Sequence, residues 1–225
     1  MQAVFDPAPK STQFHPIDAK LTFLVGFPRS GTTLLDTILR THSKIQVVEE
    51  RPLIETTQKP YEAFSIEQME KIERSEAEKA RKIYLDALDQ FATTNNGGII
   101  IDKLPLNITR VPFIRNIFPE AQFILALRHP LDAILSCWMQ KFKVNPAMAN
   151  MVDLDRIVEF YCITMRLMEL SQERYGLSVH IIKYEDLIAD KEATVKKILK
   201  FIYKLKNINF EIDEIKLKNI IESLS

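Results

Sequence analysis

Short apolar runs alternate with amphipathic stretches along almost the whole chain. Five of these runs have the length and continuous hydrophobicity of strands buried in a parallel sheet, and they lie at residues 21–25, 45–48, 99–101, 123–127 and 179–182. Between them, apolar residues recur at helical spacing, which predicts helices over residues 34–39, 65–91, 107–118, 130–142, 153–170 and 195–202, with a last one over 212–224. Strands that alternate with helices favour an α/β fold, a parallel sheet with helices on both faces.

The junction between the first strand and the first helix carries a recognisable pattern. Residues 26–33 read Gly-Phe-Pro-Arg-Ser-Gly-Thr-Thr, which is the glycine spacing of a phosphate-binding loop with threonine in place of the usual lysine. Two glycines let successive N–H groups and the helix N-terminus point at one anion, and Arg29 adds a cation inside the loop. The pattern predicts an anion site on a P-loop-type sheet. An ordinary strand and helix joined by a Ser/Thr cap is the alternative.

Polar residues also follow two other predicted strands. Arg128 ends the fourth strand and Ser136 lies eight residues later on the next helix, so the pair can grip a second anion. An arginine bonding local carbonyls beside a packed serine is the alternative. Glu49 and Glu50 end the second strand, where α/β sheets place chemistry, although acids ahead of Pro52 also suit a helix start.

Length and composition narrow the classes of protein. The chain has 225 residues, with 30 Lys plus Arg balanced by 30 Asp plus Glu, so no overall field favours nucleic acid or a membrane surface. We expect one domain over residues 20–225, preceded by a proline-containing arm over residues 1–19. Cys137 and Cys162 lack the spacing of a disulfide framework or a zinc site. With no leader and no apolar run of membrane-spanning length, the expected location is cytoplasmic.

Three segments together resemble a known family. GFPRSGTTLL, RHPLDAILSCWMQKF and VHIIKYEDL are similar to sulfotransferases that use 3′-phosphoadenosine 5′-phosphosulfate (PAPS) and release 3′-phosphoadenosine 5′-phosphate (PAP). The likeness is to the tetratricopeptide-linked bacterial type and to tyrosylprotein sulfotransferases, over about residues 20 to 205. It implies a hydroxyl-bearing acceptor, whether peptide tyrosine, carbohydrate or small alcohol, and no metal requirement. The sequence specifies neither the acceptor nor the oligomeric state.

The resemblance also implies a set of nucleotide-binding residues. The loop would hold the 5′-phosphosulfate, with Arg29 on the sulfuryl group and Thr32 and Thr33 on the phosphate. Arg128 and Ser136 match the family's 3′-phosphate pair. Including the rest of the loop and a pocket tyrosine, the implied set is Pro28, Arg29, Ser30, Gly31, Thr32, Thr33, Leu34, Arg128, Ser136 and Tyr184.

Three residues are implied to act on the reacting atoms. Glu50, counted from Arg29, matches the carboxylate that serves tyrosylprotein sulfotransferases as the base. Lys103, just past the third strand, falls near the family's lysine that balances charge on the bridging oxygen. Together with Arg29 they supply a base on one side of the sulfur and cations on the other.

Two other functions stay open. A P-loop kinase or nucleotide triphosphatase would use Asp102, at the end of the third strand, to hold magnesium. A non-catalytic nucleotide-binding module is the second alternative. Members of the resembled family continue past the last helix with a basic, serine-containing segment, and we expect the domain ending at Ser225 to lack it.

Overall fold

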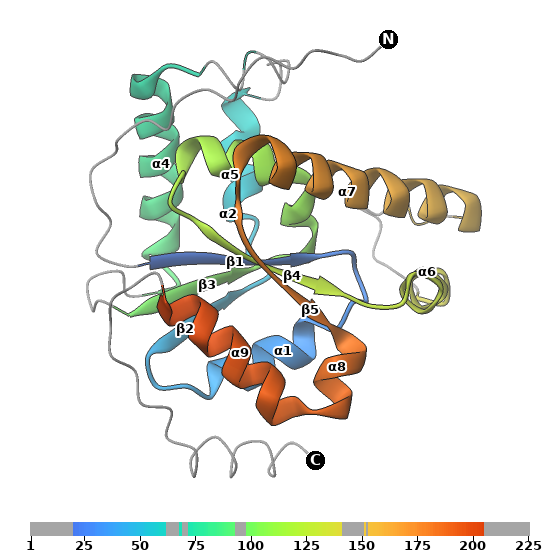
Figure 1. Ribbon diagram of the computed structural model, residues 1–225. Helices are drawn as coiled ribbons and strands as arrows, with labels where there is room; N and C mark the ends of the chain where they lie inside the picture. The colour runs from blue at the N-terminus through green and yellow to red at the C-terminus, as the bar shows by residue number, and fades with distance from the viewer. Residues whose placement is uncertain are drawn as a thin grey trace.

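The structure is a computed structural model that describes residues 20–61, 68, 72–92, 98–140, 151 and 153–204. A five-stranded parallel sheet forms the centre of this part of the chain (Figure 1), in the order β2-β3-β1-β4-β5. The strands are β1 (Lys20–Gly26), β2 (Ile45–Glu49), β3 (Ile99–Lys103), β4 (Gln122–Leu127) and β5 (Ser178–Lys183). Each apolar run expected to form a strand does so, which confirms the α/β fold.

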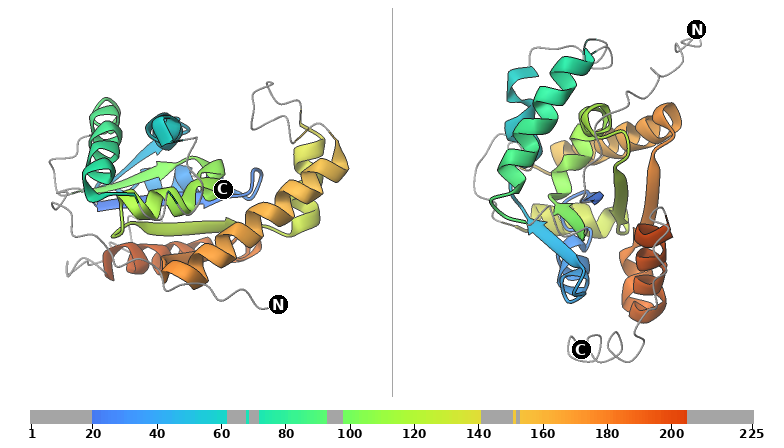
Figure 2. Two further views of the ribbon diagram at one scale, coloured as in Figure 1. Left: turned by 90° about the horizontal axis from the view of Figure 1, so that it is seen from above. Right: turned by 90° about the vertical axis from the view of Figure 1, so that its left-hand side faces the viewer.

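Helices cover both faces of the sheet (Figures 1 and 2). One face carries α1 (Thr32–Arg40), α8 (Tyr184–Ala189) and α9 (Lys191–Lys204). The other carries α2 (Leu53–Gln58), α4 (Arg74–Leu88), α5 (Val111–Ile117) and α7 (Leu154–Tyr175), with the 3₁₀ turns η1 (Lys59–Tyr61) and η3 (Pro105–Arg110). The remaining helix, α6 (Pro130–Trp138), lies beyond the carboxyl end of β4. No helix within the described ranges is long and apolar enough to span a membrane.

Successive side chains of β1 build the two cores. Phe23 faces α4 and α5, where its ring centroid lies 5.8 Å from Phe123 and 6.1 Å from Tyr84. Leu24 faces the opposite side and packs with residues of α1 and α9, among them Leu35 and Ile198. Burying each such side chain stabilises the fold by roughly 1.5–3 kcal/mol. The central strand is therefore fixed from both faces, and so is the loop that follows it.

A smaller apolar cluster holds that loop at its other end. Phe27 is completely buried between α6 and α7, and its ring lies 5.0 Å from Tyr161 in an edge-on contact. On α6, Ala133 and Cys137 complete the contact surface. The residue one position after the first glycine thus anchors the loop against two helices.

The helix predicted over residues 65–91 is wrong as a single element. Its expected start at Ser65 lies outside the described residues, and α4 begins only at Arg74. Glu73 just before it has an extended backbone, with φ −63° and ψ 149°, while Ile72 packs against the core on the α4 side. Apolar residues at helical spacing on both sides of this break concealed it.

Other boundaries also differ from the predictions. α6 ends at Trp138 rather than near residue 142, while α7 continues five residues beyond 170 to Tyr175, where Gly176 caps it with φ 58°. The stretch predicted as a helix over 107–118 is divided into η3 and α5. α2 and α8 have six residues each, too short for helical periodicity to reveal them.

Asp102 is an acid enclosed in the α4 side of the core. One of its oxygens accepts a hydrogen bond of 2.9 Å from the Tyr84 hydroxyl, and the other has no partner among the described residues. Burial raises the pKa of Asp102 from 3.8 to about 7, against the opposing effect of the Tyr84 bond. Because the pKa in the folded state exceeds that in the unfolded state, the stability contributed by the protonated acid is complete below about pH 4 and is lost as pH rises through about 7.

We expect Asp102→Asn to remove the loss of stability that accompanies ionisation of Asp102 at high pH. The variant and the parent protein should have similar unfolding free energies at pH 4, and at pH 8 the variant should be more stable, by on the order of 2–4 kcal/mol. Urea denaturation at both pH values measures the difference. An unchanged pH dependence would show that folding does not raise the pKa of Asp102.

Candidate active site

The loop between β1 and α1 curls tightly against the neighbouring strand. At Gly26 a β-carbon would lie 2.6 Å from the Ala126 carbonyl oxygen, so only hydrogen fits there. Further along, Arg29 and Gly31 adopt left-handed backbone conformations, with φ 69° and 88°. The Ser30 N–H donates to the Phe27 carbonyl at 3.2 Å and closes the turn. This conformation leads the chain directly into α1 and leaves the helix N-terminus open.

A cavity of about 210 Å³ lies at this N-terminus. Its walls come from the loop, the first turn of α1, the exit of β4 and the start of α8, and are formed by Arg29, Gly31, Thr32, Thr33, Arg128 and Tyr184. None of these six residues is acidic. Two guanidinium groups, two threonine hydroxyls and a helix N-terminus are hydrogen-bond donors that suit a phosphate or sulfate group.

Direct contacts join the two arginines expected to grip opposite ends of a ligand. The Arg29 Nε donates to Ser136 Oγ at 2.9 Å, and Arg128 Nη1 donates to the Arg29 carbonyl oxygen at 3.3 Å. The Arg128 guanidinium also lies over the Tyr184 ring, 4.8 Å from its centroid. Arg128 thus bonds a nearby carbonyl, which is the alternative that the sequence left open for it, and it also lines the cavity.

Three loop residues of the predicted set are not among those lining the cavity. The Pro28 carbonyl accepts a hydrogen bond of 3.4 Å from Cys137 Sγ, and burial raises the pKa of this thiol to about 11, with Arg29 opposing. Ser30 is buried, and Leu34 packs against the core beneath α1. Pro28 and Leu34 therefore contribute to the shape of the loop, through a backbone bond and packing.

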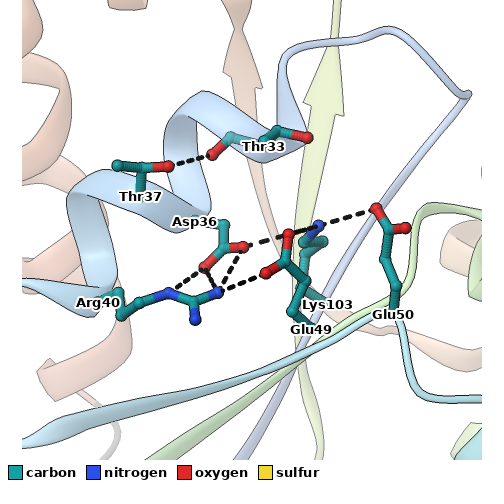
Figure 3. A network of polar contacts seen from close by, with 7 residues as sticks. All are labelled: Thr33, Asp36, Thr37, Arg40, Glu49, Glu50 and Lys103. Carbon is teal, nitrogen blue, oxygen red and sulfur yellow. Dashed lines mark hydrogen bonds and ion pairs between the residues drawn. The ribbon is translucent and has the colours of Figure 1, made fainter.

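A second polar cluster surrounds Lys103 at the end of β3 (Figure 3). The side chain has no exposed surface, and its Nζ lies 2.9 Å from Glu50, 3.0 Å from Glu49 and 3.6 Å from Asp36. Arg40 joins two of these acids, with contacts of 2.8 Å to Asp36 and 3.0 Å to Glu49. Three carboxylates and two cations from α1, β3, β2 and the residue after β2 therefore form one connected network.

The network keeps its central cation charged. Burial alone would lower the pKa of Lys103, but the hydrogen bonds to Glu50 and Glu49 more than offset it, and the net direction is upward. The Lys103 hydrogen bond is also the main cause that lowers the pKa of Glu49. For Asp36, burial raises the pKa, against the opposing Arg40 contact.

Glu50 differs from the other members of the network. Its side chain is 58% exposed, and its backbone is left-handed, with φ 49°. Its N–H donates to the Lys103 carbonyl at 2.8 Å, which holds the two residues together. Within the described ranges, only Arg29 and Glu50 among non-glycine residues have positive φ, and the sequence predicted a chemical role for both. Such strained conformations concentrate at functional sites.

The structure brings half of the predicted site residues into one cavity, and Ser136, which contacts Arg29, is not among its lining residues. Lys103 and Glu50 are not among its lining residues, but α1 connects them to it: Thr33 lines the cavity, and Asp36, three residues on, contacts Lys103. Asp102, the magnesium ligand of the kinase alternative, faces Tyr84 on the opposite side of the sheet. The assigned roles of these residues stay predictions.

Sequence reasoning overlooked several contributors. Asp36 and Arg40 have opposite charges four residues apart on a helix, a spacing that could have indicated the ion pair. Glu185 accepts a hydrogen bond of 2.8 Å from the His129 N–H, which fixes the start of α8 beside the exit of β4. No sequence signal pointed to that contact.

Comparison with known proteins identifies the family. The model of the Sulfotransferase family matches residues 22–203, so this chain belongs to the sulfotransferase family. Protein-tyrosine sulfotransferase 1 of Danio rerio is 26% identical over 196 residues, covering 82% of this chain and 53% of that protein. The chain thus spans about half the length of this curated relative, and a quarter of an uncharacterised Aquifex aeolicus protein that is 27% identical.

Solved structures share the fold. The sulfotransferase domain of the curacin biosynthetic pathway superposes with a TM-score of 0.59 at 17% identity, covering 88% of this chain and 76% of that domain. A mouse sulfotransferase complexed with PAP gives a TM-score of 0.56 at 18% identity, covering 94% of this chain and 66% of that one.

We expect Gly31→Ala to distort the cavity by displacing the Tyr184 ring. A β-carbon there would lie 2.4 Å from Tyr184 Cδ2, so the ring must move from the cavity wall, in addition to a left-handed backbone cost of about 1–2 kcal/mol. PAP binding, measured by calorimetry, should weaken by at least about tenfold, or about 1.4 kcal/mol. Gly176→Ala is the matched control, because Gly176 is also left-handed but has no atom within 4 Å of the added carbon. Equal PAP affinity in both variants would contradict the expectation.

Proposed function

We propose that this protein transfers a sulfuryl group from PAPS to a hydroxyl-bearing acceptor and releases PAP. The observation that carries the proposal is the cavity bounded by Arg29 and Arg128 at the N-terminus of α1. Family membership supports the reaction class. The PAP complex of the mouse sulfotransferase with the same fold supports the nucleotide.

The cavity residues, together with Ser136 beside Arg29, divide between the two anionic ends of the nucleotide. Arg29, Thr32 and Thr33 hold the 5′-phosphosulfate at the helix N-terminus, where N–H groups and the helix dipole favour negative charge. Arg128 and Ser136 hold the 3′-phosphate, and Tyr184 forms a wall of the pocket. The hydrogen bonds of Arg29 to Ser136 and of Arg128 to the Arg29 carbonyl support this division, because the two proposed anion-binding groups are neighbours.

Glu50 is the proposed base for the transfer. Its carboxylate takes the proton of the acceptor hydroxyl while the acceptor oxygen forms a bond to sulfur and the bond from sulfur to the phosphate oxygen breaks. The electron pair of that bond leaves with PAP. Arg29 stabilises the developing charge on the transferring group, an effect typically worth about 10²–10³ in rate. Lys103 acts on the bridging oxygen only after Glu50 releases its ammonium group.

The chemistry of the proposed base and the similarity to a named relative both favour one class of acceptor. A carboxylate base suits an acidic hydroxyl such as the phenol of tyrosine, and the zebrafish relative is named a protein-tyrosine sulfotransferase. Peptide tyrosine is therefore the first acceptor to test, followed by carbohydrates and small alcohols.

Calorimetric titration separates this proposal from the kinase alternative. The purified protein is titrated with PAP and, separately, with ATP and magnesium. We expect tight binding of PAP alone, and tight binding of ATP with magnesium alone would overturn the proposal. Labelled sulfate is then followed from PAPS to tyrosine peptides, phenols and sugars. PAP binding without any transfer would favour the non-catalytic module.

Two substitutions separate binding from chemistry. Arg29→Ala should weaken PAPS binding by about 10- to 100-fold and reduce transfer, because a charge-assisted contact to the sulfuryl group is lost. Glu50→Gln should leave PAPS affinity within about threefold and reduce transfer by 10² or more, because the amide cannot take the proton. Glu78→Gln, at an exposed ion pair on α4, is the control for removing a carboxylate. Equal loss of PAPS binding in the first two variants would refute the assigned roles.

A further inference from the structure

The carboxylates around Lys103 outnumber the cations. Asp36, Glu49 and Glu50 contribute three negative charges, while Arg40 and Lys103 contribute two positive charges. We propose that Asp36, Arg40 and Glu49 are positioning residues that keep Lys103 paired when Glu50 takes up a proton. With Glu50 neutral, two acids and two cations remain and the network is balanced. The inference rests on the proposed role of Glu50 in transfer.

The contacts distinguish the carboxylates that are held in the network from the one that can give up its contact with Lys103. Glu49 is held from two sides, by Lys103 at 3.0 Å and by Arg40 at 3.0 Å. Arg40 is in turn fixed by contacts to both oxygens of the buried Asp36. Glu50 is more than half exposed, and Lys103 is its ion-pair partner among the described residues. Glu50 is therefore the acid that can exchange its contact for a proton.

Among the described residues, few other charged groups lie near Lys103. In the sheet register, the residue of β1 opposite Lys103 is Leu24, which is apolar. From β2 and the residue after it the facing groups are Glu49 and Glu50, and from α1 they are Asp36 and Arg40 (Figure 3). If Glu49 were neutral, Glu50 would be the nearest counter-charge, because Asp36 lies 3.6 Å away and is shared with Arg40. Protonation of Glu50 would then leave a buried ammonium group poorly paired, which is strongly unfavourable.

Titration of Lys103 tests whether Glu49 and Asp36 keep this residue paired when position 50 is neutral. The experiment needs neither nucleotide nor acceptor. The protein is labelled with ¹³C at the lysine ε-carbons, and the Lys103 signal is assigned from its loss in Lys103→Arg. In Glu50→Gln, the titration midpoint of Lys103 should fall by less than about one pH unit, because Glu49 and Asp36 remain. In Glu49→Gln combined with Glu50→Gln, it should fall by about two units or more. Asp36→Asn added to Glu50→Gln should give an intermediate fall.

The proposal is overturned if Glu50→Gln alone lowers the midpoint as far as the double substitution does. Asp86→Asn, which removes one acid from an exposed ion pair on α4, is the matched control and should leave the midpoint unchanged. Unfolding curves of all variants establish that each is folded at the pH values used.

Kinetics test the consequence for transfer, with PAPS and a tyrosine peptide. In Glu49→Gln, kcat should fall by about tenfold or more at unchanged PAP affinity, and the acid limb of the kcat–pH profile should move to lower pH. A purely structural role would lower kcat without moving that limb, and this result would refute the proposal. If parent and variants transfer no sulfate, the proposed function fails. The Lys103 titration still decides whether Glu49 and Asp36 keep Lys103 paired when position 50 is neutral.

Discussion

An ammonium group without access to water needs counter-charges in direct contact, and Lys103 imposes this requirement on three elements at once. Its carboxylate partners come from α1 and from the end of β2, so both must lie at fixed positions beside β3. Removing such a partner typically costs several kcal/mol, more than the cost of about 1–2 kcal/mol for the left-handed backbone of Glu50. The ion network therefore sustains the strained residue beside it, and it secures the helix that begins at the phosphate-binding loop.

Adjacent residues of β3 occupy opposite electrical environments. Asp102 faces an apolar core, where burial raises its pKa to about 7 and the Tyr84 hydroxyl is its hydrogen-bond partner. Lys103 faces the other side, where carboxylates raise its pKa. Because successive side chains of a strand point to opposite faces of the sheet, the end of β3 places Asp102 in the apolar core and Lys103 in the charged network. The anion cavity thus remains free of the acid that a magnesium-dependent kinase would need there.

The sequence was informative where a local pattern determines the structure. Continuous apolar runs marked all five strands, and glycine spacing marked the loop in which Arg29 adopts its left-handed conformation. It was uninformative where contacts depend on distant segments. The network of Asp36 and Glu49 with Lys103 forms only when α1, β2 and β3 meet, and the complete burial of Lys103 follows from that meeting. The break before Arg74 escaped detection because apolar residues recur at helical spacing on both sides of the extended Glu73.

The close approach of Tyr184 to Gly31 has a consequence for how this pocket can diverge. The aromatic ring occupies the space that any side chain at position 31 would need. A larger residue at 31 becomes tolerable only together with a smaller one at 184, and that exchange would also remove the ring over which Arg128 lies. Among descendants of this sequence, the two positions should therefore change as a pair, and such lineages should place the second guanidinium by different means.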